Sequence, residues 1–278
     1  MISIVIPLYN KEQSIAQTLD SVLSQEGADF EVVIVDDGST DHSYTIAMGY
    51  AERNTRIRLY KQENGGPGKA RNMGTQKAKG EWIVYLDADD EIQSGSLALI
   101  TQISNQNPSF DIIDLNSCTL NGNTKIFGFH PIEGIVNNPM RQWFFHRIGP
   151  GSGHSAFKKA IMLRHPYDER IRRFEDAELL MKVLPQAKVF SCKKTMLLVH
   201  TEYASSSHPR KNVMDDYFAY LDFHKGGFWQ RMCAYRCFLE NRDLYPEYGH
   251  RHYKWMYYRY DLLLLFKLLN WWGKYFFK

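Results

Sequence analysis

The sequence predicts an α/β protein with a mixed, mainly parallel sheet flanked by helices, and a helical segment at its C-terminus. Through the first hundred residues, short β-branched runs alternate with stretches in which apolar residues recur at helical spacing. This alternation is typical of parallel sheets, because parallel neighbours need a crossover connection, usually a helix. From about residue 223 the composition becomes basic and aromatic, which marks a separate segment.

The expected strands are short runs of β-branched and other apolar residues. The run at 30–35 is nearly continuous, which is typical of a strand buried on both faces. Pro7 follows the first run, which suits a strand end because proline cannot donate to a sheet ladder. Strands are expected at residues 2–6, 30–35, 57–60, 82–86, 111–115 and 196–199.

Helices are expected where apolar residues recur three or four positions apart. In the segment 15–23 they stand at i, i+4, i+7 and i+8, which is one face of an amphipathic helix. A second helix is expected at 69–79 between two glycines, and a third begins near Phe174 with an acidic first turn.

The overall composition excludes several classes of protein. With 44% hydrophobic and 23% charged residues the chain is not expected to be disordered. A net charge of +3 is too small to indicate that the chain as a whole binds nucleic acid. The four cysteines form neither a zinc pattern nor a disulfide framework. Without a secretory signal or a run of roughly 20 apolar residues, a cytoplasmic location is expected.

Polar clusters follow three of the expected strands, at residues 9–10, 36–38 and 87–90. In open parallel sheets ligands bind beyond the carboxyl ends of the strands, so these clusters should converge on one site. Asp87 and Asp89 lie on the same side of an extended segment and repel each other unless a cation or a proton lies between them. A divalent metal bound to phosphate fits this pair, but an acidic turn before a helix would explain it too.

The other clusters also allow two interpretations. Asp37 could bind a base or ribose, or the segment 36–41 could simply begin a helix. The glycine-rich segment 64–68 could offer backbone N–H groups to phosphate, with charge added by Lys69, or be a plain loop. It is not a Walker A loop. Acids at 175–176 are explained by the helix dipole, and His200 is either a metal ligand or structural.

Together these residues resemble the family 2 glycosyltransferases, which have the nucleotide-sugar-binding GT-A fold. The resemblance is strong over roughly residues 1–105, thin from there to about 207, and not recognisable beyond. The matching stretches are 3–10, 33–41, 68–74, 85–90 and 174–176.

The resemblance implies a role for each matching residue. Asp37 would contact the base, Asp87 would approach the ribose or metal shell, and Asp89 would coordinate Mn²⁺ or Mg²⁺, with His200 as a further candidate ligand. Asp176 would be the general base, with Glu175 as its neighbour. The expected donor-binding residues, Lys69 among them for its charge, are Pro7, Tyr9, Glu12, Asp37, Lys69, Arg71 and Asp87.

The activity implied by the resemblance is inverting transfer of a sugar from a nucleotide-activated donor, with a UDP-sugar favoured. The acceptor would be a saccharide or lipid-linked saccharide, as in cell-surface polysaccharide or glycolipid assembly. Because no Gln-x-x-Arg-Trp motif follows Asp176, a non-processive enzyme is expected. The expected organisation is a nucleotide-sugar-binding half at 1–105, an acceptor-side half of the same domain at 106–222, and a tail at 223–278.

Three other classes of protein compete with this interpretation. A receiver-like signalling domain also carries paired acids and a phosphoacceptor Asp, but its paired acids follow the first strand, whereas here they follow the second. A nucleotidyltransferase would show a Gly-rich basic loop near the first strand, where this chain has residues 9–12 instead. A non-catalytic nucleotide-sugar-binding protein remains open if the acids are structural.

The tail has a composition of its own. Residues 225–278 hold ten Lys or Arg and four Asp or Glu, a net charge of +6, and 17 of the 39 aromatic residues. If 261–278 is helical, cationic residues lie opposite Leu and Trp, which suits a helix in a membrane interface. The tail therefore predicts a peripheral position on the inner face of the cell membrane, although packing on the protein itself would explain the same pattern.

Overall fold

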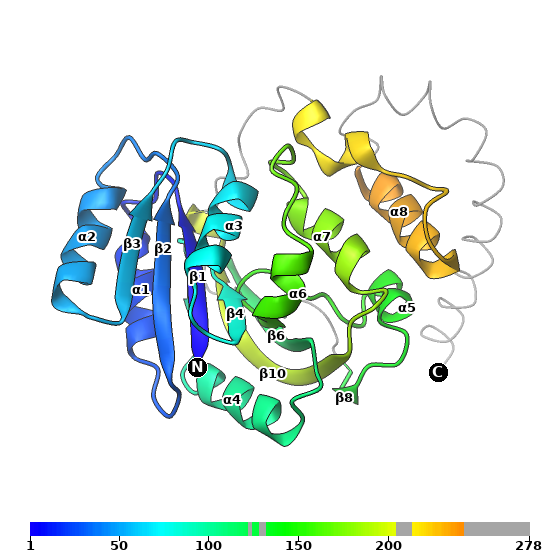
Figure 1. Cartoon of the computed structure of the whole chain (residues 1–278), viewed down its shortest axis with the longest axis horizontal. Coiled ribbons are helices and arrows are strands. Elements are labelled where there is room, and N and C mark those ends of the chain that lie inside the picture. The colour runs from blue at the N-terminus through cyan, green and yellow to red at the C-terminus, as the bar shows by residue number, and fades with distance from the viewer. Residues whose placement is uncertain (122–123, 128–131, 204–212, 242–278) are drawn as a thin grey trace. The chain divides into compact units, whose positions relative to one another are not determined.

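The computed structural model describes residues 1–121, 124–127, 132–203 and 213–241 of the 278-residue chain (Figure 1). The chain divides into two compact units, Met1–Tyr220 and Leu221–Lys278. The first unit contains the sheet and all of the predicted strands. Its strands are β1 Ile2–Leu8, β2 Phe30–Asp36, β3 Ile57–Lys61, β4 Trp82–Tyr85, β5 Asp90–Ile92, β6 Ile112–Asn121, β7 Thr124–Phe127, β8 Gly134–Ile135, β9 Ser155–Lys158 and β10 Val189–His200.

The sheet is mixed, with the strand order β3-β2-β1-β4-β9-β6-β10-β5, and β7 and β8 pair at its side with β6 and β10. The four strands β3, β2, β1 and β4 are parallel, as the alternation of strands and helices predicted. Strand β9 enters antiparallel to both β4 and β6, whereas β6 and β10 are parallel. This arrangement confirms the predicted mixed sheet flanked by helices.

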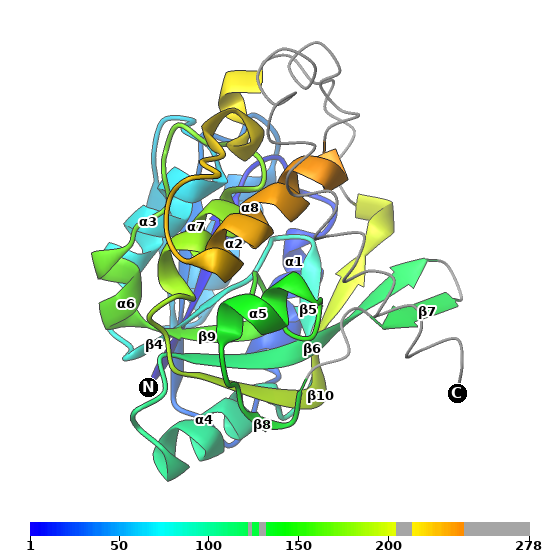
Figure 2. The ribbon, with the colours of Figure 1, turned by 90° about the vertical axis from the view of Figure 1, so that its right-hand side faces the viewer.

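The described helices cover both faces of this sheet (Figures 1 and 2). In the first unit they are α1 Ile15–Leu23, α2 Ser43–Arg53, α3 Pro67–Lys77, α4 Ser96–Gln106, α5 Pro139–Phe144, α6 Lys159–Arg164 and α7 Glu175–Val183, with 3-10 turns at Thr201–Tyr203, Val213–Asp215 and Tyr217–Tyr220. Helix α3 begins two residues before its predicted start, because Pro67 is well suited to a first helical turn.

The alternation of side chains along β1 explains how two layers of helices are held. Ile4 and Ile6 belong to the core that includes the apolar faces of α1 and α4, among them Leu19. Val5 points to the opposite face, where a Cβ at Gly74 of α3 would overlap one of its methyl groups. Glycine at this position therefore lets α3 approach the sheet closely, which brings the residues of α3 toward the carboxyl ends of the strands.

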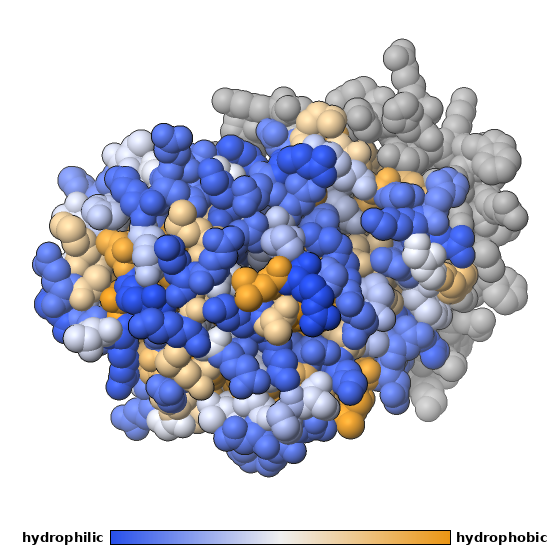
Figure 3. Space-filling model, in the orientation of Figure 1, coloured by the Kyte–Doolittle hydropathy of each residue, from blue (hydrophilic) through white to orange (hydrophobic). Residues whose placement is uncertain are grey.

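The described residues seen in Figure 3 are mostly hydrophilic, with small, separate apolar patches. In the second unit, helix α8 spans Phe228–Asn241, within the predicted helical C-terminal segment. The helix predicted at 261–278 lies outside the described residues. Among the helices that the structure describes, none is both long and apolar enough to cross a bilayer.

Candidate active site

The buried guanidinium of Arg71 is the centre of a cluster of carboxylates. Its Nη1 donates to Oε1 of Glu175 at 2.6 Å and its Nη2 to Oδ1 of Asp87 at 2.8 Å. Oδ1 of Asp176 lies 3.9 Å from Nη1. One cation on α3 thus holds together the acid that follows β4 and the two acids that begin α7.

Burial and charge act in opposite directions in this cluster. Burial opposes the positive charge of Arg71, but Asp87 and Asp176 outweigh it and hold the pKa of the guanidinium well above its ordinary value. Burial raises the pKa of Glu175, and Arg71 acts against that rise. The permanent charge of an arginine is therefore what allows several carboxylates to be half-buried together.

Helix α7 begins where it does because of its acids and its strained entry. Phe174, directly before the helix, has a left-handed backbone with φ of 55°, and Glu175, Asp176 and Glu178 stand in the first turn. Acids are favoured at this end by the helix dipole. The sharp turn at Phe174 lets the first turn of α7 contact α3, from which it is separated by about a hundred residues.

A cavity of about 370 Å³ lies beside this cluster. Asp176 forms part of its wall, and its carboxylate also accepts hydrogen bonds from Tyr167 at 2.9 Å and from Ser152 at 3.3 Å. The lining includes Trp143, Gly149, Gly151, Phe174, Asp176 and Leu180. The loop 149–151 thus contributes to a cavity together with the predicted general base.

Asp37 closes the glycine-rich loop onto the end of β2. Its Oδ1 accepts from the side chain of Gln62 at 2.7 Å and from the N–H of Gly65 at 2.8 Å, and its Oδ2 accepts from the N–H of Gly66 at 2.8 Å. The sequence allowed two interpretations of this loop, N–H groups that face phosphate or a plain loop. The N–H groups of Gly65 and Gly66 are instead satisfied by Asp37, because a carboxylate at the start of α3 meets the same donors and the same helix dipole.

The loops after β1 and β2 are joined by hydrogen bonds from backbone N–H groups to side chains. Asn10, with a φ of 50°, accepts from the N–H of Thr40 at 2.9 Å, and Glu12 accepts from the N–H of His42 at 2.9 Å at the start of α2. Tyr9 is exposed and Pro7 is half-buried within β1. The predicted donor-binding residues of this region therefore share one edge of the sheet, as expected.

Asp89 forms an ion pair with Lys11 at 2.5 Å that sequence reasoning did not find. Burial raises the pKa of Asp89 and Lys11 opposes that rise. Burial, followed by repulsion from Asp87 and Asp89, raises the pKa of Asp90 to about 8. Three acids lie here within electrostatic reach of one another, and one lysine relieves only part of the repulsion.

This acidic segment fits a hard divalent cation of the kind that takes its other ligands from phosphate and water. Such a cation is commonly held by one or two carboxylates, which Asp87 and Asp89 provide. The described residues contain no group of three or more His, Cys, Asp or Glu that could hold a metal by themselves. His200, predicted as a further ligand, has its ring nitrogens against Glu91 at 2.5 Å and Glu202 at 3.6 Å.

The structure therefore brings together four predicted residues, Arg71, Asp87, Glu175 and Asp176, in direct contact. It places Asp37 and Lys69 at the adjoining glycine-rich loop, where the stem of Lys69 lies against Gly65. Lys11, Asn72, Ser152 and Tyr167 are polar residues of the site that the sequence did not reveal. No spacing pattern could have found them, since each acts through contacts with other elements of the fold.

Comparison with known proteins identifies the family of this chain. A model of glycosyl transferase family 2 matches residues 3–159, more than half of the chain. The chain is 41% identical over 233 residues to the uncharacterized glycosyltransferase EpsJ of Bacillus subtilis (strain 168), which covers 78% of this chain and 66% of EpsJ. The chain therefore belongs to glycosyl transferase family 2, which confirms the predicted family and the enzyme class of glycosyltransferase.

Solved structures show the same fold. S. aureus TarS 1-349 in complex with UDP-GlcNAc matches with a TM-score of 0.62 and 23% identity, over 77% of this chain and 60% of that one. GalNAc-T7 with UDP, GalNAc and Mn²⁺ matches with a TM-score of 0.57 and 19% identity, over 72% and 44%. These matches confirm the predicted GT-A fold. The chain spans less than two thirds of the length of EpsJ and of both structures.

Proposed function

We propose that this protein transfers a sugar from a UDP-sugar to an acceptor hydroxyl, with inversion at the anomeric carbon and with a divalent metal. The observation that carries the proposal is the convergence of Asp87, Glu175 and Asp176 on Arg71 beside a cavity of about 370 Å³. A donor site and a base would thus lie within reach of one another. The UDP and UDP-GlcNAc complexes of TarS support the choice of donor.

In the proposed reaction Asp176 accepts the proton of the acceptor hydroxyl. The acceptor oxygen then forms a bond to the anomeric carbon while the bond from that carbon to the diphosphate oxygen breaks, and UDP leaves with the electron pair. General base catalysis of this kind contributes about 10² to 10⁴ in rate. The partial exposure of Asp176 in the cavity wall, at 36%, lets a hydroxyl reach it.

The nucleotide is proposed to lie along the edge formed by the strand-end loops. Asp37 uses three of about four acceptor positions within the protein, which leaves room for an N–H of the base. Tyr9 is exposed for stacking, and Lys69 adds positive charge near the diphosphate. Pro7 and Glu12 would shape the nucleotide end of this pocket.

Asp87 and Asp89 are proposed to hold Mn²⁺ or Mg²⁺. When bound there, such a cation supplies Lewis acidity and neutralises charge on the leaving diphosphate. The ion pair between Lys11 and Asp89 has a place in this scheme, because an ammonium can neutralise the carboxylate until the donor arrives. Glu175 remains paired with Arg71 and keeps the guanidinium in place.

The acceptor is proposed to be a saccharide or a lipid-linked saccharide in cell-surface polysaccharide or glycolipid assembly. Trp143 and Phe174 give the cavity two aromatic side chains against which the apolar face of a sugar ring can pack. The basic, aromatic tail at 223–278 would hold the enzyme on the cytoplasmic face of the membrane. Residues 242–278 lie outside the described part of the chain.

A panel of nucleotide sugars, each with and without Mn²⁺, tests the donor and the metal together. Released nucleotide is measured for each combination, and the expected result is metal-dependent release of UDP from one UDP-sugar. Binding without any release would favour a non-catalytic nucleotide-sugar-binding protein instead. Release that is equally fast in a chelator would contradict the metal.

The proposed membrane contact has its own test. The full chain and a variant that ends at Arg251 are sedimented with anionic vesicles, and the full chain is expected to bind while the shortened one does not. Equal binding of the two would contradict a role for the tail.

A further inference from the structure

The two oxygens of Asp176 have unequal surroundings. Oδ1 accepts a hydrogen bond of 2.9 Å from the hydroxyl of Tyr167 and lies 3.9 Å from Nη1 of Arg71. Within the described part of the chain, Oδ2 accepts from the hydroxyl of Ser152 alone, at the longer distance of 3.3 Å. One oxygen is therefore held by a short bond and a cation, whereas the other has a weak contact that an incoming hydroxyl can replace.

Tyr167 is suited to hold Oδ1 because its own position is tightly determined. Its ring is buried, packs edge-on against Tyr85 at 5.5 Å, and has the guanidinium of Arg71 5.4 Å from its centre. Burial and the nearby charge of Asp176 raise the pKa of the Tyr167 hydroxyl well above its ordinary value. The hydroxyl therefore stays protonated and acts as a donor to the carboxylate.

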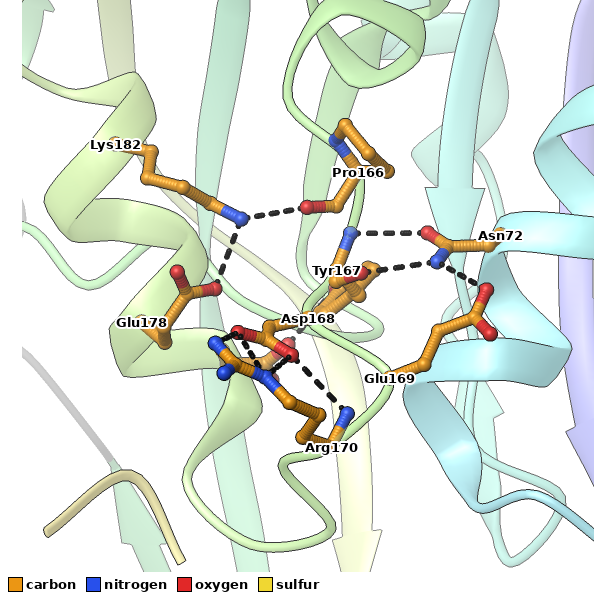
Figure 4. A network of polar contacts seen from close by, with 9 residues as sticks. Asn72, Pro166, Tyr167, Asp168, Glu169, Arg170, Glu178 and Lys182 are labelled. Atoms are coloured by element: carbon orange, nitrogen blue, oxygen red, sulfur yellow. Dashed lines mark hydrogen bonds and ion pairs between the residues drawn. The ribbon is translucent and has the colours of Figure 1, made fainter. Parts of the chain in front are cut away.

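Asn72 forms hydrogen bonds with both the N–H and the carbonyl of Tyr167 (Figure 4). Its Oδ1 accepts from the N–H of Tyr167 at 2.9 Å, and its Nδ2 donates to the carbonyl of Tyr167 at 3.0 Å. On the α7 side, Lys182 donates to the carbonyl of Pro166 at 2.5 Å and pairs with Glu178 at 2.9 Å. The segment that carries Tyr167 is thus held between α3 and α7.

Arg71 and Asn72 are consecutive residues of α3, and both act on Asp176. Arg71 does so directly, while Asn72 does so through Tyr167. The helix that begins at the glycine-rich loop on the donor side therefore also determines where the acceptor-side carboxylate lies. This is a physical connection between the two halves of the site.

We propose that Tyr167, held by Asn72, is a positioning residue that fixes Asp176 by its Oδ1 and leaves Oδ2 to take the proton of the acceptor. The proposal rests on the function proposed above for Asp176. In the transfer step the acceptor O–H bond breaks and its proton goes to Oδ2, while the proton of Tyr167 stays on its own oxygen. Ser152 yields its place on Oδ2 to the acceptor hydroxyl.

The variant Tyr167→Phe tests this proposal, because it removes only the hydroxyl. We expect kcat to fall about 10- to 100-fold, as for a lost hydrogen bond to a charged group, with little change in the KM for the donor. The pH dependence of kcat is measured as well, because a merely structural role of Tyr167 would leave it unchanged. Besides Tyr167, the titratable groups of the described residues that interact with Asp176 are Arg71, Glu175 and Tyr85.

Tyr85→Phe is the matched control, since it removes another buried tyrosine hydroxyl, which contacts Thr75 at 2.7 Å. It should leave kcat and the pH profile close to those of the unchanged enzyme. If Tyr167→Phe melts at a similar temperature and keeps its full kcat and pH profile, the proposal is overturned. Asn72→Ser should reproduce the effect of Tyr167→Phe in weaker form and add little to it in the double variant.

A measurement without turnover separates this proposal from the proposed function. The ¹³C carboxyl resonance of Asp176, assigned by its loss in Asp176→Asn, is recorded at one pH in the unchanged protein, in Tyr167→Phe and in Tyr85→Phe. A resonance that moves in Tyr167→Phe and stays in place in Tyr85→Phe supports the positioning role even if no donor is turned over, in which case only the proposed function fails. A resonance that Tyr167→Phe leaves unchanged in an active enzyme overturns the positioning role alone.

Discussion

The strand-end loops (residues 8–12, 36–41, 62–68 and 86–90) and the pocket wall (residues 143–180) of this protein are built in different ways. The loops are joined to one another by backbone N–H groups and short side chains, as where Asp37 accepts from Gly65 and Gly66. The pocket wall is joined to the rest of the site by a few side chains that bridge large separations in sequence. Arg71 and Glu175 are 104 residues apart, and Asn72 and Tyr167 are 95 apart.

This difference assigns different tasks to the two regions. Loops that satisfy their own backbone groups form a rigid edge, which suits the binding of a nucleotide common to many donors. A wall held by single side chains can change its lining while it keeps Asp176, which suits the proposed binding of an acceptor. If this is right, variants of the loops should act on donor binding, and variants of the wall should act on transfer.

The largest effect is expected for Asp176→Asn, in the pocket wall. Transfer should fall by about 10² to 10⁴, because the acceptor loses its base, while the dissociation constant of the donor stays the same. Steady-state transfer and calorimetric donor binding are measured on the same preparation. Asp29→Asn, an exposed acid before β2, serves as the control. Weaker donor binding by Asp176→Asn would contradict the assignment of donor binding to the loops and of transfer to the pocket wall.

Arg71→Leu should disturb both regions at once, because it leaves Asp87 and Glu175 without their shared cation. Removal of one partner from a buried ion pair costs about 3–5 kcal/mol, so the free energy of unfolding should fall by this order at neutral pH. The loss should shrink as the pH is lowered and the acids take up protons. Arg58→Leu, which breaks a more exposed pair with Glu31, should cost less. Equal losses in urea unfolding would contradict the central place of Arg71.

The variant Asp89→Ala tests the part that the strand-end loops take in binding metal and nucleotide. In the presence of Mn²⁺ the affinity for UDP should fall about tenfold or more, whereas the affinity in a chelator should hardly change. A Mn²⁺ titration of UDP binding by calorimetry measures both quantities. A metal titration that is the same for the variant and for the unchanged protein would remove Asp89 from the proposed metal site.

The smallest effect is expected at Asp114, a buried acid on β6 that accepts from Ser155 at 3.0 Å. Burial raises its pKa to about 6, and the nearby His154 opposes that rise. Because the folded protein then holds a proton that the unfolded chain releases, the free energy of unfolding should fall as the pH rises from about 4 to 6. In Asp114→Asn the free energy of unfolding should fall less over this pH range, by an amount on the order of 2 kcal/mol. An unchanged slope in urea unfolding would contradict the raised pKa.

The strand-end loops were also the part that sequence reasoning predicted best. Their residues stand in continuous motifs, and the carboxyl ends of β1, β2 and β4 meet because parallel neighbours share one direction. The antiparallel entry of β9 was not predicted, since its four residues include only two apolar side chains, Ala156 and Phe157, too few to mark a strand. The N–H groups of Gly65 and Gly66 donate to Asp37. This is a tertiary contact that no local sequence pattern encodes.

The pocket wall was predicted only through Glu175 and Asp176. Tyr167 follows a proline in a loop, and nothing in its neighbours marks it as a contact of Asp176. Asn72 stood within a matching motif, yet its partner lies 95 residues away and could not be read from spacing. Side chains whose role depends on contacts between different elements can be recognised only in the folded structure.

The configuration of the product tests the central claim most directly. A single base on the acceptor side, opposite the departing diphosphate, predicts direct displacement at the anomeric carbon. The anomeric proton of the product, followed by NMR from the first turnovers of an α-linked UDP-sugar, should therefore report a β-linkage. A product that keeps the α-configuration would contradict the account, because Asp176 could not then act as the base of a single displacement.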